Sequence, residues 1–155
     1  MKNNYVLRQL RYIFDLNDEQ MIDLFAQAEV VVARTEVSNW LKREEHPDYQ
    51  RISDSKFASF LNGFINHKRG KRPGPQPAPE KRLNNNIIFR KLKIALNYKD
   101  TDIINTYDYV GMHISKHELS AIFRHPSQNQ YRDCEDQFLR NFLYGLKKKY
   151  RPAEE

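Results

Sequence analysis

The sequence contains one segment twice, and this duplication constrains the fold more than any other feature. Residues 3–64 align with residues 85–146 at a constant shift of 82 positions, without a gap, and 13 of the 62 aligned positions are identical. This is about three times the identity that ordinary composition gives by chance. The identical pairs are Asn3/Asn85, Asn4/Asn86, Arg8/Arg90, Leu10/Leu92, Asp18/Asp100, Ile22/Ile104, Glu36/Glu118, Ser38/Ser120, Tyr49/Tyr131, Asp54/Asp136, Phe60/Phe142, Leu61/Leu143 and Gly63/Gly145. The duplication predicts two copies of the same fold, related by a rigid-body motion.

Apolar residues in each copy recur at the 3.6-residue spacing of amphipathic helices. The four predicted stripes of the first copy are Val6, Leu7, Leu10, Ile13 and Phe14; Met21, Ile22 and Phe25; Val37, Trp40 and Leu41; and Phe57, Phe60, Leu61 and Phe64. The aligned positions of the second copy repeat all four stripes. No segment shows the period-two alternation and turn residues of a β-hairpin. Each copy is therefore predicted to be a four-helix, all-α unit.

Polar residues before these stripes predict where the helices begin. Asn4 and Asn86 precede the first stripe of each copy and are predicted to be N-caps. Asn17 with Gln20 predicts a capping box at the second helix, and the segment 115–118 predicts another at the third helix of the second copy. The first copy has Ala33 where that third helix would need a serine.

A proline-rich segment separates the two copies. Prolines occupy alternate positions from Pro73 to Pro79, which forbids helix and favours an extended, semi-rigid spacer. The predicted organisation is a first helical repeat over 1–66, a basic Pro-rich linker over 67–83, and a second helical repeat with a basic tail over 84–155.

The net charge of +6 is unevenly distributed along the chain. Residues 3–64 carry a net charge of −3 and residues 85–146 carry +1, whereas residues 65–84 carry +5 and residues 147–155 carry +2. The positive charge therefore belongs to the linker and the tail rather than to the folded repeats. Two interpretations stay open: these cations complement the C-terminal ends of helices, or they form a patch for a polyanion.

The second and third predicted helices of each copy resemble the helix-turn-helix of repressor-like domains. The matching stretches are residues 30–42 and 112–124, with a small apolar turn residue followed by a cap and a buried face. In such domains the exposed start of the second helix reaches base edges. The residues placed there in this sequence are Arg34, Lys42, Lys116, His117 and Arg124. The turn is a residue or two longer than usual, and Glu36 lies on the supposed recognition face of the first copy.

The sequence predicts no metal, cofactor or catalytic site. His113, His117, His125 and Cys134 are residue types that ligate zinc, but the first copy has no ligand residue at the aligned positions. No glycine-rich phosphate loop or nucleophile elbow occurs. We therefore expect no cofactor, and we expect that the protein is not an enzyme.

The single cysteine fits a reducing compartment. The first residues resemble no signal peptide, and no apolar stretch approaches the roughly 20 residues that span a bilayer. These features predict a cytoplasmic protein without a membrane partner.

Over nearly the whole chain, the sequence also resembles the YehS-like family of duplicated all-α bacterial proteins. The matching stretches include Glu36-Val37-Ser38, Phe60-Leu61-Asn62-Gly63 and His67-Lys68-Arg69-Gly70-Lys71, and in the second copy Ser115-Lys116-His117-Glu118-Leu119-Ser120 and Asp136-Gln137-Phe138-Leu139-Arg140-Asn141-Phe142. That family has no known function. The resemblance implies a cytoplasmic duplicated domain and supplies no catalytic residues.

The preferred hypothesis from the sequence is a nucleic-acid-binding accessory or regulatory factor, with DNA or RNA as partner. The phosphates would be held by Lys68, Arg69, Lys71 and Arg72 in the linker and by Lys147, Lys148 and Lys149 in the tail. The alternative is a protein–protein adaptor, in which the acidic first copy binds a protein partner and the linker only increases solubility.

Overall fold

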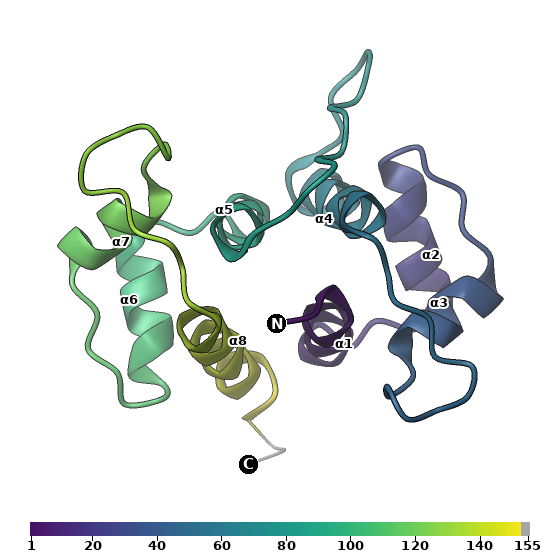
Figure 1. The fold of residues 1–155 in the computed structure, drawn as a ribbon, viewed down its shortest axis with the longest axis horizontal. Coiled ribbons are helices and arrows are strands. Elements are labelled where there is room, and N and C mark those ends of the chain that lie inside the picture. The colour runs from purple at the N-terminus through teal and green to yellow at the C-terminus, as the bar shows by residue number, and fades with distance from the viewer. Residues whose placement is uncertain (153–155) are drawn as a thin grey trace. The chain divides into compact units, whose positions relative to one another are not determined.

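The computed structural model describes residues 1–152, which form eight α-helices, four in each repeat (Figure 1). The first repeat contains α1 (Asn3–Ile13), α2 (Asp18–Gln27), α3 (Arg34–Leu41) and α4 (Asp54–Arg69). The second contains α5 (Asn85–Leu96), α6 (Asp100–Asp108), α7 (Lys116–Phe123) and α8 (Asp136–Tyr150). Every helix of the second repeat begins 82 residues after its counterpart, so the predicted all-α duplication is confirmed. The chain divides into two compact units between Leu83 and Asn84.

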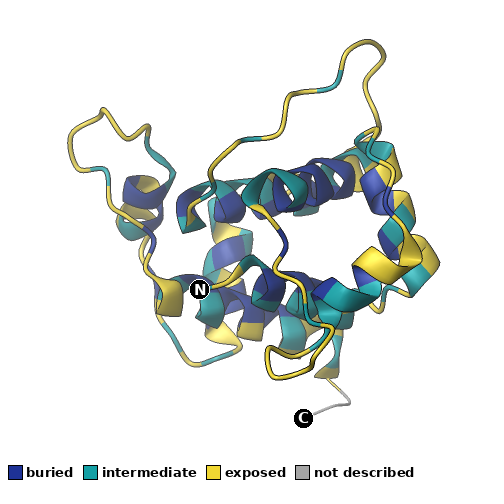
Figure 2. Cartoon of the chain, turned by 45° about the vertical axis from the view of Figure 1, so that its right-hand side comes forward, coloured by how far each residue is buried: buried dark blue, intermediate teal, exposed yellow. Residues whose placement is uncertain are grey.

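The predicted apolar stripes form the core of each unit, and the buried positions follow one side of each helix (Figure 2). In α4 the four predicted core residues, from Phe57 to Phe64, are all at most 2% exposed, and their counterparts in α8 are fully buried. Six predicted stripe residues are only half-buried: Phe14, Ile22 and Leu41 and their counterparts Leu96, Ile104 and Phe123. The first and second helices of each repeat pack against this long fourth helix, and the third helix packs against the first and second.

Two identical glycines allow the second and fourth helices of each repeat to approach closely. A Cβ atom on Gly63 would overlap the carbonyl oxygen of Leu24 in α2, and a Cβ atom on Gly145 would overlap the carbonyl oxygen of Thr106 in α6. Leu24 and Thr106 are themselves aligned positions. The same backbone contact therefore sets the helix spacing in both repeats.

The two cores obtain one of their aromatic contacts from different helices. In the first repeat, Phe25 of α2 packs on Trp40 of α3 with ring centroids 5.5 Å apart. Its counterpart Tyr107 packs instead on Phe138 of α8, with centroids 4.9 Å apart. The position of the tryptophan is taken by Ile122 in α7. The aromatic partner of this residue therefore comes from the third helix in the first repeat and from the fourth helix in the second.

A buried asparagine ties the first helix of each repeat to the loop between its third and fourth helices. The side-chain amide nitrogen of Asn4 donates to the carbonyl oxygens of Trp40 (2.9 Å) and Gln50 (2.8 Å), and its oxygen accepts from the Ile52 N–H at 3.1 Å. Asn86 makes the same three hydrogen bonds at the aligned positions, with Ile122, Arg132 and Cys134.

The prediction that Asn4 and Asn86 are N-caps is therefore wrong. The N-caps are Lys2 and Asn84, and the two asparagines lie inside the first turn. An asparagine that precedes an apolar stripe looks the same in sequence whether its amide bonds to its own helix or to a distant loop.

The predicted capping boxes are confirmed. Asn17 and Gln20 exchange hydrogen bonds of 2.8 Å at the start of α2, and Ser115 and Glu118 do so at 3.1 Å at the start of α7. At α3, Ala33 has no side-chain acceptor, and only the half in which Glu36 accepts from the Ala33 N–H is formed.

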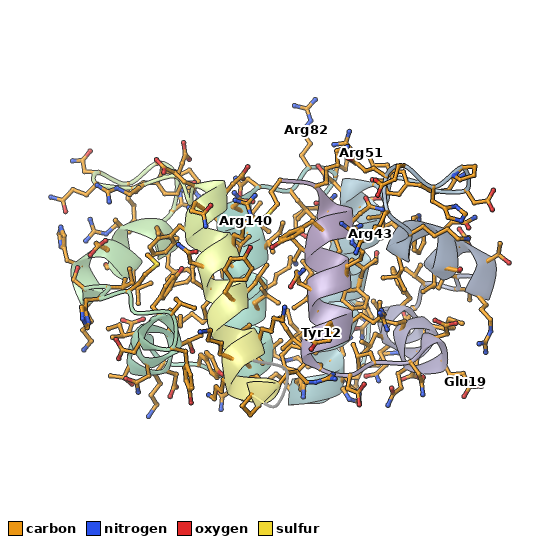
Figure 3. All side chains as sticks on the ribbon, turned by 90° about the horizontal axis from the view of Figure 1, so that it is seen from below. Tyr12, Glu19, Arg43, Arg51, Arg82 and Arg140 are labelled. Carbon is orange, nitrogen blue, oxygen red and sulfur yellow. The ribbon has the colours of Figure 1, made fainter. Side chains whose placement is uncertain are left out.

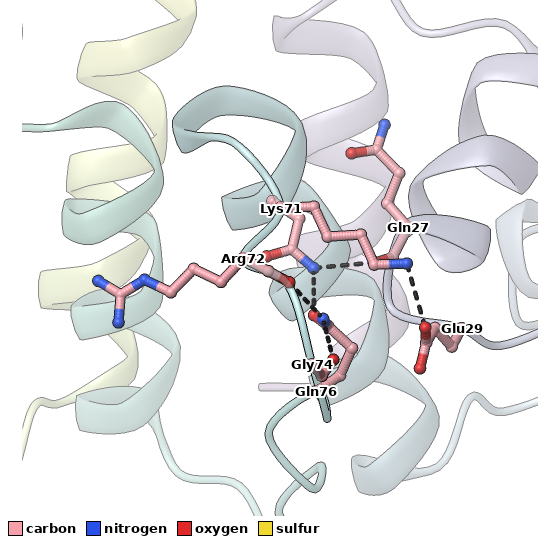
Figure 4. Close-up of polar contacts among 7 residues, drawn as sticks. Gln27, Glu29, Lys71, Arg72, Gly74 and Gln76 are labelled. Carbon is pink, nitrogen blue, oxygen red and sulfur yellow. Dashed lines mark hydrogen bonds and ion pairs between the residues drawn. The ribbon is translucent and has the colours of Figure 1, made fainter.

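Hydrogen bonds attach the linker to both ends of α4. Asn66 near the end of α4 donates to the Gln76 side chain at 2.9 Å, and Gln76 donates back to the Arg72 and Gly74 carbonyls (Figure 4). Further on, the Leu83 N–H donates to the carboxylate of Asp54 at the start of α4, at 2.9 Å. The segment after α4 thus returns to the beginning of the same helix, which extends the first unit to Leu83.

Replacing Asn4 with Ala tests the contribution of the buried amide. We expect the free energy of unfolding to fall by roughly 2–4 kcal/mol, because two carbonyls and one N–H lose their partner together. Urea unfolding measures this decrease. Asn105→Ala, at an exposed position in α6, is the matched control and should change stability by less than about 0.5 kcal/mol. Equal effects of the two substitutions would contradict the role of Asn4.

Gly63→Ala tests the close approach of α2 and α4. The added methyl group meets backbone rather than a movable side chain, so we expect the free energy of unfolding to fall by about 3 kcal/mol or more. Gly70→Ala is the control, because Gly70 has open space around it and only an unfavourable φ of 92°. That control should cost about 1 kcal/mol. A Gly63→Ala protein as stable as the control would show that the helices can separate freely.

Candidate functional site

In the first repeat, the two side chains predicted to contact nucleic acid, those of Arg34 and Lys42, already contact other side chains of the same repeat. Arg34 lies 3.5 Å from the carboxylate of Asp18 and 3.6 Å from that of Glu19, both at the start of α2. The Lys42 ammonium donates to the Asn39 side chain at 2.7 Å. The positive charge at the start of α3 is therefore largely compensated locally.

The equivalent surface of the second repeat leaves its cation uncompensated. Asp100, the counterpart of Asp18, pairs with Lys93 of α5 at 3.3 Å. Lys116, the counterpart of Arg34, is exposed, and its ammonium has no ion-pair or hydrogen-bond partner within residues 1–152. His117 beside it is also exposed. The duplicated positions thus differ in available charge, although the helices match.

Arg124, at the end of α7, has a structural contact. Its guanidinium donates to the Asn129 carbonyl oxygen at 3.2 Å and to the Gln130 side chain at 2.9 Å. Gln130 has a left-handed backbone, with φ of 67°. Arg124 therefore stabilises the turn of the α7–α8 loop, and a substitution there would alter this loop as well as the charge.

The four predicted phosphate-binding residues around the start of the linker divide into two pairs. The Lys68 ammonium lies over the rings of Phe14 and Phe64, 5.4 and 5.8 Å from their centroids. Lys71 pairs with Glu29 at 3.2 Å, as Figure 4 shows. Arg69 and Arg72 are exposed, and neither side chain has a polar partner among residues 1–152. In Figure 4 the Arg72 side chain extends away from the contacts that order the linker.

Of the predicted tail lysines, Lys149 contacts a tyrosine of its own repeat. Lys149 donates to the Tyr98 hydroxyl at 2.8 Å and lies 4.7 Å from the centre of that ring. Burial, together with the hydrogen bond between the Tyr150 and Tyr98 hydroxyls, raises the pKa of Tyr150 to about 12, so this phenol stays neutral beside the ammonium. Lys147 is half-buried and Lys148 is exposed.

The structure adds exposed cations that the sequence pattern did not single out. The side chains of Lys81 and Arg82 near the end of the linker, and of Arg43 and Arg51 in the α3–α4 loop, have no polar partner in the described part of the chain. The Arg82 side chain projects clear of the ribbon in Figure 3, where Arg43 and Arg51 are also labelled. A sequence shows how many cations a segment carries, but pairing decides their availability, and pairing is a tertiary property.

The histidines and the cysteine considered as metal ligands do not form a metal site. No group of three His, Cys, Asp or Glu side chains within residues 1–152 is placed to hold a metal ion. His113 lies 3.6 Å from Asp108, whereas Cys134 is buried. No helix within these residues is long and apolar enough to cross a membrane.

These features define a class: an all-α protein built from two copies of one four-helix unit. The chain belongs to the family described as protein of unknown function (DUF1456), which matches residues 3–70 and again residues 85–151. It is 39% identical over 147 residues to the uncharacterized protein YehS of Escherichia coli (strain K12), covering 94% of each chain. The predicted family resemblance is thus confirmed. No solved structure matches the chain.

Cys134 should react slowly while the protein is folded. Burial, reinforced by the negative charge of Asp136, raises the pKa of its thiol from 9.0 to about 12. The thiolate fraction at pH 8 is then about a thousandfold lower than in an unfolded chain. Timed labelling with a thiol reagent, with and without denaturant, measures the difference. Rapid labelling of the folded protein would contradict this expectation.

The raised pKa of the Cys134 thiol also makes the stability of the fold depend on pH. Since the folded pKa is higher than the unfolded one, the neutral thiol stabilises the fold fully below pH 9, and this contribution is lost as the pH rises towards 12.

Proposed function

We propose that this protein binds nucleic acid through its linker, the start of α7 and the tail of α8, as an accessory or regulatory factor. The proposal is for a binding protein rather than an enzyme. The single cysteine, typical of chains in reducing compartments, supports a cytoplasmic location for it.

The observation that carries the proposal is the state of two arginines: Arg69, which the structure places as the last residue of α4 rather than in the predicted linker, and Arg72 in the linker that follows. Arg69 and Arg72 are exposed and unpaired among the described residues, yet the segment that bears them is anchored by the Asn66–Gln76 and Lys71–Glu29 contacts. A guanidinium presents a planar fork of donors that matches a phosphate. Because the backbone is already ordered, less conformational entropy is lost when a phosphate is bound. Glu29 neutralises Lys71 but leaves both arginines available.

The start of α7 supports a contribution from the second repeat. Lys116, His117 and Ser120 are exposed on this helix, while Glu118 is engaged with Ser115. The connection from α6 to α7 spans residues 109–115, longer than the three to four residues of a helix-turn-helix turn. We therefore propose phosphate contact through Lys116 first, and base contact only where the longer turn lets α7 enter a groove.

The tail contributes Lys147 and Lys148 to the proposed surface. Lys149 is engaged with Tyr98 and has a structural role in addition to its charge.

A protein–protein adaptor is the second candidate, and one observation favours it. Val31, in the α2–α3 loop, is 93% exposed, and the carboxylates of Glu29, which pairs with Lys71, and of Glu36 at the start of α3 are exposed as well. An exposed apolar residue with acidic neighbours suits a basic protein partner better than a phosphate backbone.

The decisive experiment measures binding of the full chain to labelled random duplex and single-stranded DNA by fluorescence anisotropy across a salt series. We expect salt-dependent affinity for the unmodified protein. Arg69→Ala combined with Arg72→Ala should weaken binding equally for all sequences. On duplex DNA, the slope of log affinity against log salt should become shallower by roughly 0.9 for each phosphate that the variant no longer neutralises.

The matched control is Arg43→Ala combined with Arg51→Ala, which removes the same charge from exposed arginines outside the proposed surface. This control should retain most of the affinity and of the salt slope. Equal decreases in both double variants would show that net charge, not the linker, determines binding. If the unmodified protein binds no nucleic acid at low ionic strength, the adaptor becomes the preferred function.

A further inference from the structure

A hollow of about 450 Å³ opens in the second repeat between α7, the α7–α8 loop and the start of α8. It is lined by Glu118, Ile122, Arg132, Asp133, Glu135 and Phe138, and we refer to it as the second-repeat hollow. Its volume lies within the range of ligand pockets in proteins. All of its lining residues belong to one unit.

Comparison of the two repeats shows that the hollow contains a smaller residue, Ile122, where the first repeat has a tryptophan. In the first repeat the aligned position of Ile122 holds Trp40, which is only 7% exposed and lies over Phe25. In the second repeat the aromatic partner of Tyr107 comes from Phe138 on α8, and α7 supplies only Ile122. The indole is thus missing from the face of α7 that lines the hollow.

The chemistry of the lining selects a cation with a flat apolar body. Phe138 and Ile122 provide the apolar part, and Phe138 is half-buried. The lining holds three carboxylates and one guanidinium, that of Arg132, so it is net negative. Glu118 already accepts from Ser115, whereas Glu135 is exposed and its carboxylate has no hydrogen-bond or ion-pair partner among residues 1–152.

We propose that the second-repeat hollow receives an arginine side chain from a protein partner. A guanidinium stacks on an aromatic ring and donates two parallel hydrogen bonds to a carboxylate, here Phe138 and Glu135. A lysine ammonium is a compact, strongly hydrated charge and uses the ring and the carboxylate less well. The negative lining disfavours a phosphate. Arginine binding in the hollow is independent of nucleic-acid binding elsewhere on the chain, and the experiment that tests it contains no nucleic acid.

The test uses the full chain and three tripeptides, acetyl-Gly-Arg-Gly-amide and its lysine and citrulline counterparts. Citrulline has the shape of arginine without its charge. Backbone amide shifts in two-dimensional NMR should move saturably at Ile122, Glu135 and Phe138 with the arginine peptide. The other two peptides should bind at least about tenfold more weakly, because a charge-assisted hydrogen bond is absent or poorly formed.

Two variants locate the binding site. Glu135→Gln should weaken binding of the arginine peptide by roughly fivefold to tenfold, and Glu45→Gln, an exposed carboxylate of the first repeat, should leave it unchanged. Ile122→Trp restores the residue of the first repeat and should abolish binding by filling the hollow, provided that its spectrum is that of a folded protein. Glu135→Gln keeps the test valid if Ile122→Trp does not fold.

Three results would overturn the proposal: no saturable shift at the hollow, equal affinity for the citrulline peptide, or unchanged affinity in Glu135→Gln. Tighter binding of the lysine peptide would assign the site to a different cation and would also overturn it.

Discussion

The buried amides of Asn4 and Asn86 are the interactions on which each repeat depends. Each amide satisfies two carbonyls and one N–H at the end of the third helix and in the irregular segment that follows it. Backbone polar groups of a loop packed near a core need such partners, because water cannot reach them. The amide therefore holds the end of the third helix, and the segment that leads to the fourth, against the first helix. With the glycine contact between the second and fourth helices, it determines the shape of the repeat.

The two repeats share this skeleton and differ in what they display. In the first, Arg34 is compensated by two carboxylates of α2; in the second, Lys116 is left available because Asp100 pairs with Lys93. The cores differ in a related way, with an aromatic group supplied by Trp40 in one and by Phe138 in the other. After a duplication, the inherited hydrogen bonds preserve the fold while exchanges of this kind give each copy its own surface.

The linker connects the charge of the chain to its fold. A proline-rich segment alone would be a semi-rigid spacer, but here Gln76 and Leu83 bond it to both ends of α4. The predicted linker began at residue 67, but α4 continues to Arg69, so Lys68 and Arg69 belong to its last turn. The cations of this turn and of the linker fall into two groups. Lys68 and Lys71 take part in contacts with the first repeat, whereas Arg69 and Arg72 are available to a ligand. For the proposed binding surface, the number of cations without a partner matters more than the total number of positive charges.

The sequence by itself determined the duplication, the eight helices, the core stripes and the capping boxes, because these follow from repeated residues and from local periodicity. The role of Asn4, the pairing of Arg34 and Lys71, and the hollow beside Phe138 were decided only by the tertiary structure. Most of these contacts join residues tens of positions apart in the chain, such as Asn4 with Gln50 or Lys71 with Glu29. A local pattern records which groups a helix exposes or buries, but the partner of a polar group is fixed only when the helices pack.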